Sequence, residues 1–225
     1  MRILAVYPPY PGKMNNYLKL PSIELCILSK ILSDYGYDMD LFDMRIDSLG
    51  IDDFINKIQK ERYDVIYFED CCETFCETIK LINASKEFDS NILTVLHSDI
   101  SSLKPMIFMK RYSNIDFIVR YDDDYAFLNV VNEVIKNHNY HRIPNIAYRE
   151  NCQIHITKVL KDYYDINDLP MPNRELYDLD KYLKNDSRLS KIAPFTFRAK
   201  NSSNHKIRLN CRVFLMLKNF LKLFF

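Results

Sequence analysis

The stretch "DVIYFEDCCETFCETIKLINASKEFDSNILTVLH", residues 64–97, decides the fold of this chain. Its two apolar runs, 64–68 and 91–97, have the length and the β-branched and aromatic content of buried strands, and residues 78–88 between them have a helical pattern. Two parallel strands need a crossover connection, and a helix is the usual one. The stretch therefore predicts a βαβ unit and a parallel sheet.

The same alternation continues on both sides of this stretch. Ser22 is suited to cap the start of a helix and Gly36 to end it. The further expected strands are 2–7, 37–44 and 115–121, and the further expected helices are 22–36, 51–63 and 126–137. We therefore expect an α/β fold: a flavodoxin-like (Rossmann-like), doubly wound parallel five-stranded sheet with strand order 2-1-3-4-5.

After residue 140 the pattern changes. Residues 144–158 are typical of a small β-hairpin around Glu150 and Asn151, and residues 165–183 are typical of an extended, proline-marked linker. The expected organisation is an α/β domain over 1–140, a hairpin and linker over 141–187, and a basic, apolar tail over 188–225.

Composition and charge limit the function classes. The chain has 225 residues, 48% of them hydrophobic, which is enough for one core of ordinary size. Six cysteines without a secretory leader predict reduced thiols and a cytoplasmic protein, and no apolar run is long enough to predict a membrane span. The tail holds nine Lys or Arg and no acid, so contact with a membrane surface stays open as an interpretation. No nucleic-acid partner is expected, because no binding module frames these basic residues.

Three of the six cysteines lie close together in "YFEDCCETFC", residues 67–76. Cys72 and Cys76 form CxxxC, but the third position of a CxxxCxxC iron-sulfur motif is Ile79, and no fourth ligand for a zinc site lies nearby. The spacing favours loop thiols over a metal site. The acids of "YDDDY", residues 121–125, are open to two interpretations: a Mg²⁺ site, or carboxylates that stabilise a helix N-terminus.

Ligands of a doubly wound sheet bind at the carboxyl ends of its strands. The loops to consider are therefore "PPYPGKMNNYLKLP", "EDCCE", "HSDISSLKP" and "YDDDY". His97, next to Ser98 and Asp99, is a candidate to ligate a cobalt or to contact a cofactor side chain, and a surface histidine without such a role is the alternative. The phosphate-binding and nucleophile motifs GxGxxG, GxxxxGK[ST] and GxSxG are all absent from the sequence.

Several landmarks together resemble one family. They are "RILAVYPPYPG", "LPSIELCILSKILSDYGYDMDLFD", "IDFIVRYDDD", "IPNIAYREN" and "DINDLPMPNRELYDLDKYL". With them, residues 1 to 183 resemble the N-terminal cobalamin-binding domain of cobalamin-dependent radical S-adenosylmethionine enzymes. The resemblance implies cobalamin as cofactor, with the corrin over "YPPYPG" and the nucleotide tail between "EDCC" and "HSDIS". The implied cofactor-binding residues are Tyr7, Pro8, Pro9, Tyr10, Gly12, Asp70, Cys71, His97, Ser98 and Tyr121; no catalytic and no metal-ligating residue is implied.

The sequence departs from the family in two ways. No CxxxCxxC follows Tyr182, so neither an iron-sulfur cluster nor S-adenosylmethionine is expected on this chain, and the tail is interpreted as truncated or divergent. The DxHxxG motif is missing, and His97, Ser98 and the acids Asp122 to Asp124 stand where the family has glycines, which predicts weakened cofactor binding.

The leading hypothesis is therefore a cobalamin-binding-type domain without its catalytic domain, and not catalytic alone. The alternative is a non-catalytic interaction module that docks to a separate radical enzyme or catalytic subunit. A third hypothesis is an independent metal-binding enzyme built on the cysteines.

Overall fold

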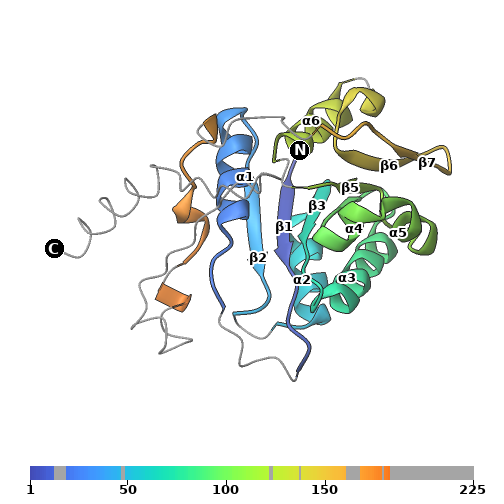
Figure 1. Ribbon diagram of the computed structural model, residues 1–225. Helices are drawn as coiled ribbons and strands as arrows, with labels where there is room; N and C mark the ends of the chain where they lie inside the picture. The colour runs from blue at the N-terminus through green and yellow to red at the C-terminus, as the bar shows by residue number, and fades with distance from the viewer. Residues whose placement is uncertain are drawn as a thin grey trace, which may run out of the picture.

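The computed structural model describes residues 1–12, 19–46, 49–121, 124–136, 138–160, 168–178 and 180–182 (Figure 1). Its centre is one seven-stranded sheet in the order β2-β1-β3-β4-β5-β6-β7. The parallel strands are β1 (Ile3–Tyr7), β2 (Met39–Asp43), β3 (Val65–Glu69), β4 (Leu93–His97) and β5 (Phe117–Val119). This confirms the α/β class and the order 2-1-3-4-5. The expectations for the tail, for Asp122 and Asp123 and for part of the linker lie outside the described residues.

The predicted hairpin is present and extends the same sheet. β6 (Ile146–Glu150) pairs antiparallel with β5, with Phe117 opposite Tyr148, and β7 (Gln153–Ile156) pairs antiparallel with β6. Asn151 and Cys152 between them have φ of 48° and 62°, which makes a tight reversal of the chain.

Alternating residues of β1 face two separate layers of the core. Ile3 and Ala5 belong to one cluster of buried apolar side chains, Leu4 and Val6 to the other, and none is more than 1% exposed. Successive side chains of a strand point to opposite faces, so a strand that is apolar throughout is covered on both sides. This is why the apolar runs predicted the central strands correctly.

Helices cover both faces of the sheet (Figure 1). α1 (Ile23–Asp34) and α6 (Asp124–Ile135) contribute to the first cluster, and α2 (Ile51–Glu61) and α3 (Phe75–Phe88) to the second. As the sequence predicts, the Ser22 hydroxyl accepts a hydrogen bond from Leu25 N at 3.2 Å, and Gly36 follows α1 with φ of +83°. The connection from β4 to β5 contains two short helices, α4 (Asp99–Leu103) and α5 (Pro105–Arg111), where the sequence indicated only a loop.

The segment after the hairpin packs along the body of the protein. Residues 168–178 and 180–182, here called the strap, lie beside α1 (Figure 1). Asn173 N donates to Cys26 O at 2.9 Å, and Asn173 Nδ2 donates to Ser29 Oγ at 3.1 Å. Tyr177 and Tyr182 join a third apolar cluster with Cys26. The sequence predicted an extended linker here, but the described residues of the strap pack against α1.

Among the helices of the described residues, none combines the length and the apolar character that crossing a bilayer requires.

Candidate functional site

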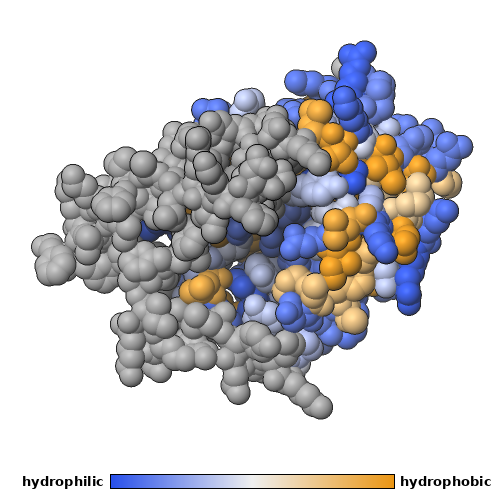
Figure 2. Space-filling model, in the orientation of Figure 1, coloured by the Kyte–Doolittle hydropathy of each residue, from blue (hydrophilic) through white to orange (hydrophobic). Residues whose placement is uncertain are grey.

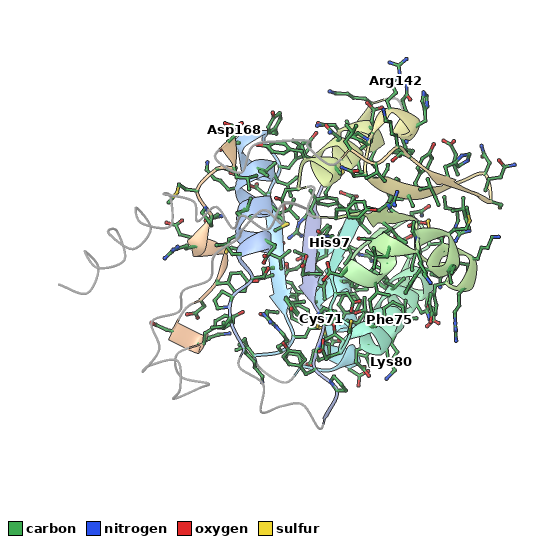
Figure 3. All side chains as sticks on the ribbon, viewed as in Figure 1. Cys71, Phe75, Lys80, His97, Arg142 and Asp168 are labelled. Atoms are coloured by element: carbon green, nitrogen blue, oxygen red, sulfur yellow. The ribbon has the colours of Figure 1, made fainter. Side chains whose placement is uncertain are left out.

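The residues that the sequence singled out gather at one edge of the sheet. Tyr7 and His97 are the last residues of β1 and β4, Asp70 directly follows β3, and Tyr121 comes two residues after β5. In the sheet β1, β3, β4 and β5 are consecutive neighbours, so these four positions lie side by side at what we call the carboxyl edge. Figure 3 shows Cys71 and Phe75 toward this edge, and Arg142 on the opposite side of the molecule.

His97 connects three strands of the carboxyl edge. Its Nδ1 lies 3.1 Å from Glu69 Oε2 and its Nε2 lies 2.9 Å from Tyr121 O. A carboxylate and a carbonyl are both hydrogen-bond acceptors, so each ring nitrogen is placed to donate. The side chain is only 13% exposed and stacks on Tyr67, with ring centroids 6.1 Å apart. As arranged here, His97 is a positioned cross-link between strand ends, with each ring nitrogen facing an oxygen of the chain.

Tyr121 has a backbone conformation that usually belongs to glycine. Its φ is +60°, its N–H donates to Ser102 Oγ at 3.1 Å, and its carbonyl contacts His97. Its ring lies near the buried Arg120, whose guanidinium carbon is 5.2 Å from the ring centroid. A left-handed position outside glycine costs about 1 kcal/mol and persists only where neighbours enforce it. The turn after β5 thus keeps a glycine-like path with a tyrosine in place.

Asp70 is a buried carboxyl at the end of β3. It is 8% exposed, and its Oδ1 accepts hydrogen bonds from Thr74 Oγ1 at 2.8 Å and Thr78 Oγ1 at 2.6 Å. Burial raises the pKa of Asp70 to about 6, against the lowering effect of the two threonine hydroxyls. Asp70 N also donates to His97 O at 2.9 Å, so the turns after β3 and β4 are joined directly.

The three clustered cysteines differ in exposure. Cys71 is half-buried, with its sulfur 3.4 Å from Thr74 Oγ1, and burial raises its pKa. Cys72 and Cys76 are exposed, and α3 starts at Phe75, so Cys76 lies in its first turn and Cys72 before it. Across the described part of the chain, no group of three or more His, Cys, Asp or Glu side chains is arranged to hold a metal ion.

Ser98 caps the helix that begins after β4. It is 3% exposed, and its Oγ accepts from Ser101 N at 3.1 Å and donates to Ser101 Oγ at 2.9 Å. Ser102 Oγ donates to Ser98 O at 2.7 Å. The Ser98 hydroxyl therefore has its hydrogen-bond partners within this turn, and its role here is to cap the start of α4.

The described residues directly after β1, 8–12, become more exposed along the chain. Pro8 is buried, Pro9 and Tyr10 are half-buried, and Gly12 is exposed. A Cβ added at Gly12 would meet no atom within 4 Å. The backbone at Gly12 is therefore open on that side.

Two residues of this edge did not emerge from the sequence. Arg45 places its guanidinium carbon 3.4 Å from the Tyr7 ring centroid and forms a buried ion pair with Asp43, at 2.5 Å between Nη2 and Oδ2. Burial raises the pKa of the Tyr7 hydroxyl well above its ordinary value, and Arg45 opposes this increase. Asp43 ends β2, so the rule that ligands gather at strand ends could have identified it. Arg45 had no such signal.

An apolar patch flanks the carboxyl edge. Ile100, Leu103 and Ile107 of α4 and α5 are 41%, 71% and 58% exposed. Figure 2 shows apolar side chains over these two helices. Side chains of this size are normally covered, so the patch marks a surface suited to contact with another molecule.

The fit of this edge to a corrinoid can be judged from its residues. The backbone at Gly12 is open, whereas Tyr121 combines a left-handed backbone with a ring that occupies the space a glycine would leave. His97 is committed to Glu69 and Tyr121, so the arrangement fits a corrinoid held without a cobalt ligand from that histidine.

Comparisons with known proteins agree with this fold. No model of a protein family matches the chain. An uncharacterized methyltransferase of Pyrococcus horikoshii is 21% identical over 184 residues, which is 81% of this chain and 40% of that protein. The cobalamin-dependent S-adenosylmethionine radical enzyme OxsB, with aqua-cobalamin and S-adenosylmethionine bound, is similar over 81% of this chain and 25% of its own, with TM-score 0.65 and 18% identity.

A second solved structure has the same fold. The radical S-adenosylmethionine methyltransferase TsrM from Kitasatospora setae, with tryptophan and an S-adenosylmethionine analogue bound, is similar over 80% of this chain and 36% of its own, with TM-score 0.61 and 12% identity. The chain thus spans well under half the length of the relatives it matches, and at these identities the likeness shows a shared fold.

Proposed function

We propose that this protein is a cobalamin-binding-type domain that works with a radical S-adenosylmethionine catalytic unit. The observation that carries the proposal is the layout of the carboxyl edge, where all ten candidate residues follow or end four neighbouring parallel strands. The fold shared with OxsB, whose structure contains aqua-cobalamin, supports the choice of cofactor.

In this proposal the residues after β1 hold the corrin and the turns after β3, β4 and β5 border it. Gly12 allows close contact, and His97 keeps the ends of β3, β4 and β5 in register. Bound cobalamin would supply a cobalt centre able to carry a transferable group. The residues of this chain bind and orient it, and the partner catalytic unit supplies the reaction.

Anaerobic reconstitution tests the proposal. The full chain is incubated with hydroxocobalamin and desalted, and its visible spectrum is recorded. Retained corrin absorbance near one equivalent supports the proposal, and a spectrum free of corrin absorbance at saturating cofactor would refute it. Bovine serum albumin carried through the same steps controls for nonspecific retention.

The apolar patch of Ile100, Leu103 and Ile107 favours a second candidate, an interaction module for the same kind of catalytic unit. If the protein is such a module, it should associate with a radical S-adenosylmethionine enzyme from the same genome, in the presence or absence of cobalamin. The variant Leu103→Glu should weaken that association, and Leu160→Glu, at an exposed position of similar character, is the control. Equal association of both variants would exclude this patch.

A further inference from the structure

One buried arginine contacts the residues at both ends of the segment that follows β1, residues 8–19, of which the structure describes 8–12 and 19. The guanidinium carbon of Arg45 lies 3.4 Å from the centroid of the Tyr7 ring, directly before this segment. An Nη2 hydrogen of the same group donates to Leu20 O at 2.9 Å, at the far end. Tyr7 and Leu20 therefore have fixed positions relative to one side chain.

Asp43 holds Arg45 in this position. Arg45 Nε donates to Asp43 Oδ1 at 2.9 Å and Arg45 Nη2 donates to Asp43 Oδ2 at 2.5 Å, a bidentate pair whose side chains are 4% and 6% exposed. Burial lowers the pKa of Arg45, but the hydrogen bonds and charge of Asp43 outweigh it, so the pKa lies above its ordinary value. A planar, paired guanidinium has little freedom to turn away from the Tyr7 ring.

The strap is attached to the same group of residues. Tyr182 donates its hydroxyl hydrogen to Asp43 Oδ2 at 2.5 Å, and Tyr177 accepts a hydrogen bond from Ser22 N at 3.1 Å, two residues beyond Leu20. The Tyr177 and Tyr182 rings are 5.4 Å apart at 71°. The strap thus binds Asp43, and the ends of the segment after β1 contact Arg45, which is paired with Asp43.

We infer that Arg45 is a positioning residue for the described ends of the segment after β1, and that Tyr182 couples this positioning to the docked strap through Asp43. That the positioned segment receives a corrinoid rests on the proposed function. The mechanical coupling itself does not, because it follows from contacts within the chain. A change that lifts the strap would therefore loosen the residues next to Tyr7 and Leu20.

Hydrogen exchange with residue resolution on the full chain tests the inference. The double variant Asp43→Asn with Arg45→Met removes the guanidinium without leaving an unpaired buried carboxylate. We expect exchange at the amides of Ser22 and Met44, which donate to the Tyr177 hydroxyl and to Tyr7 O, to become about tenfold faster. Tyr182→Phe, which keeps the ion pair, should give a smaller increase at the same amides.

The opposite edge of the sheet offers a matched control. Arg2 pairs with Asp40 of β2 at 2.9 Å, and its guanidinium carbon lies 4.9 Å from the Tyr63 ring centroid. The double variant Asp40→Asn with Arg2→Met should leave exchange at Ser22 and Met44 unchanged. Equal exchange at these amides in the Asp43/Arg45 variant and wild type would overturn the inference. So would uniformly faster exchange that includes β3 and β4, since Arg45 would then be a general stabiliser.

Cobalamin affinity separates this inference from the proposed function. If wild-type protein binds hydroxocobalamin, the Asp43/Arg45 variant should bind it at least about tenfold more weakly, and equal affinity would overturn the positioning role. If wild-type protein binds none, the proposed function fails, while the exchange experiment still decides the coupling between the strap and the segment after β1.

Discussion

His97 and Glu69 face each other across β4 and β3, with 3.1 Å between the imidazole Nδ1 and the carboxylate Oε2. Since Nε2 of the same ring contacts Tyr121 O at 2.9 Å, one side chain ties the ends of three neighbouring strands together. The histidine that the sequence offered as a cofactor contact is thus also a structural cross-link.

Replacing His97 with alanine should destabilise the protein without changing how a bound cobalt is ligated. We expect the free energy of unfolding to fall by about 1–3 kcal/mol, because Glu69 and the Tyr121 carbonyl lose their partner. The visible spectrum of bound hydroxocobalamin should keep its band positions. The control is His155→Ala on β7, where the ring stacks on Tyr148 at 5.0 Å between centroids. Band positions that shift only in His97→Ala would mean that the histidine ligates cobalt after all.

Asp70 should make stability depend on pH. Its pKa is about 6 in the folded protein against an ordinary 3.8, so between these values the folded state binds more protons than the unfolded state. The contribution is fully present below pH 3.8 and is lost as the pH rises through 6, by up to roughly 3 kcal/mol. Urea denaturation at several pH values measures it.

The variant Asp70→Asn isolates this effect. Its amide oxygen can still accept from Thr74 and Thr78, so it should match wild type near pH 4 and become the more stable protein toward pH 7. Asp52→Asn, at an exposed acid of the first turn of α2, is the control and should follow wild type throughout. Parallel curves for Asp70→Asn and wild type would contradict a raised pKa.

The left-handed backbone at Tyr121 predicts an unusual order of stability. Tyr121→Gly and Tyr121→Ala both lose the ring near Arg120, but only glycine adopts φ of +60° without strain. We expect the glycine variant to be the more stable of the two by about 1 kcal/mol in thermal or urea unfolding. At Lys60, in the last turn of α2, the same pair should show the reverse order, with alanine more stable. If the alanine variant is also the more stable one at position 121, the backbone there does not keep its positive φ in solution.

The thiols should react in the order of their exposure. Cys72 and Cys76 should be alkylated fastest and Cys71 more slowly, because burial raises its pKa. Cys26 should resist labelling in the folded protein, since burial raises its pKa to about 12. Mass spectrometry after timed treatment with iodoacetamide gives the rate at each site, and unfolded protein in urea is the control. Protection of Cys72 and Cys76 together, reversed by a chelator, would revive the metal hypothesis.

Much of the scaffold was predictable because the signals are local. Apolar runs marked four of the five parallel strands, alternation marked β2, and Ser22 and Gly36 marked the ends of α1. The start of α3 was placed three residues late, and the short helices α4 and α5 were missed, since a few residues carry too little periodicity to show a helix. The placement of Tyr7, Asp70, His97 and Tyr121 at one edge followed from strand order.

The sequence by itself determined the α/β class and the edge at which the candidate residues gather, because these depend on spacing within short segments and on the geometry of parallel sheets. Only the tertiary structure decided what those residues do. Arg45 contacts Tyr7 and Leu20, and Asp43 binds Tyr182. His97 contacts Tyr121. In each case tertiary packing brings together residues from separate parts of the chain. Such contacts depend on how whole elements pack, so no local pattern in the sequence could reveal them.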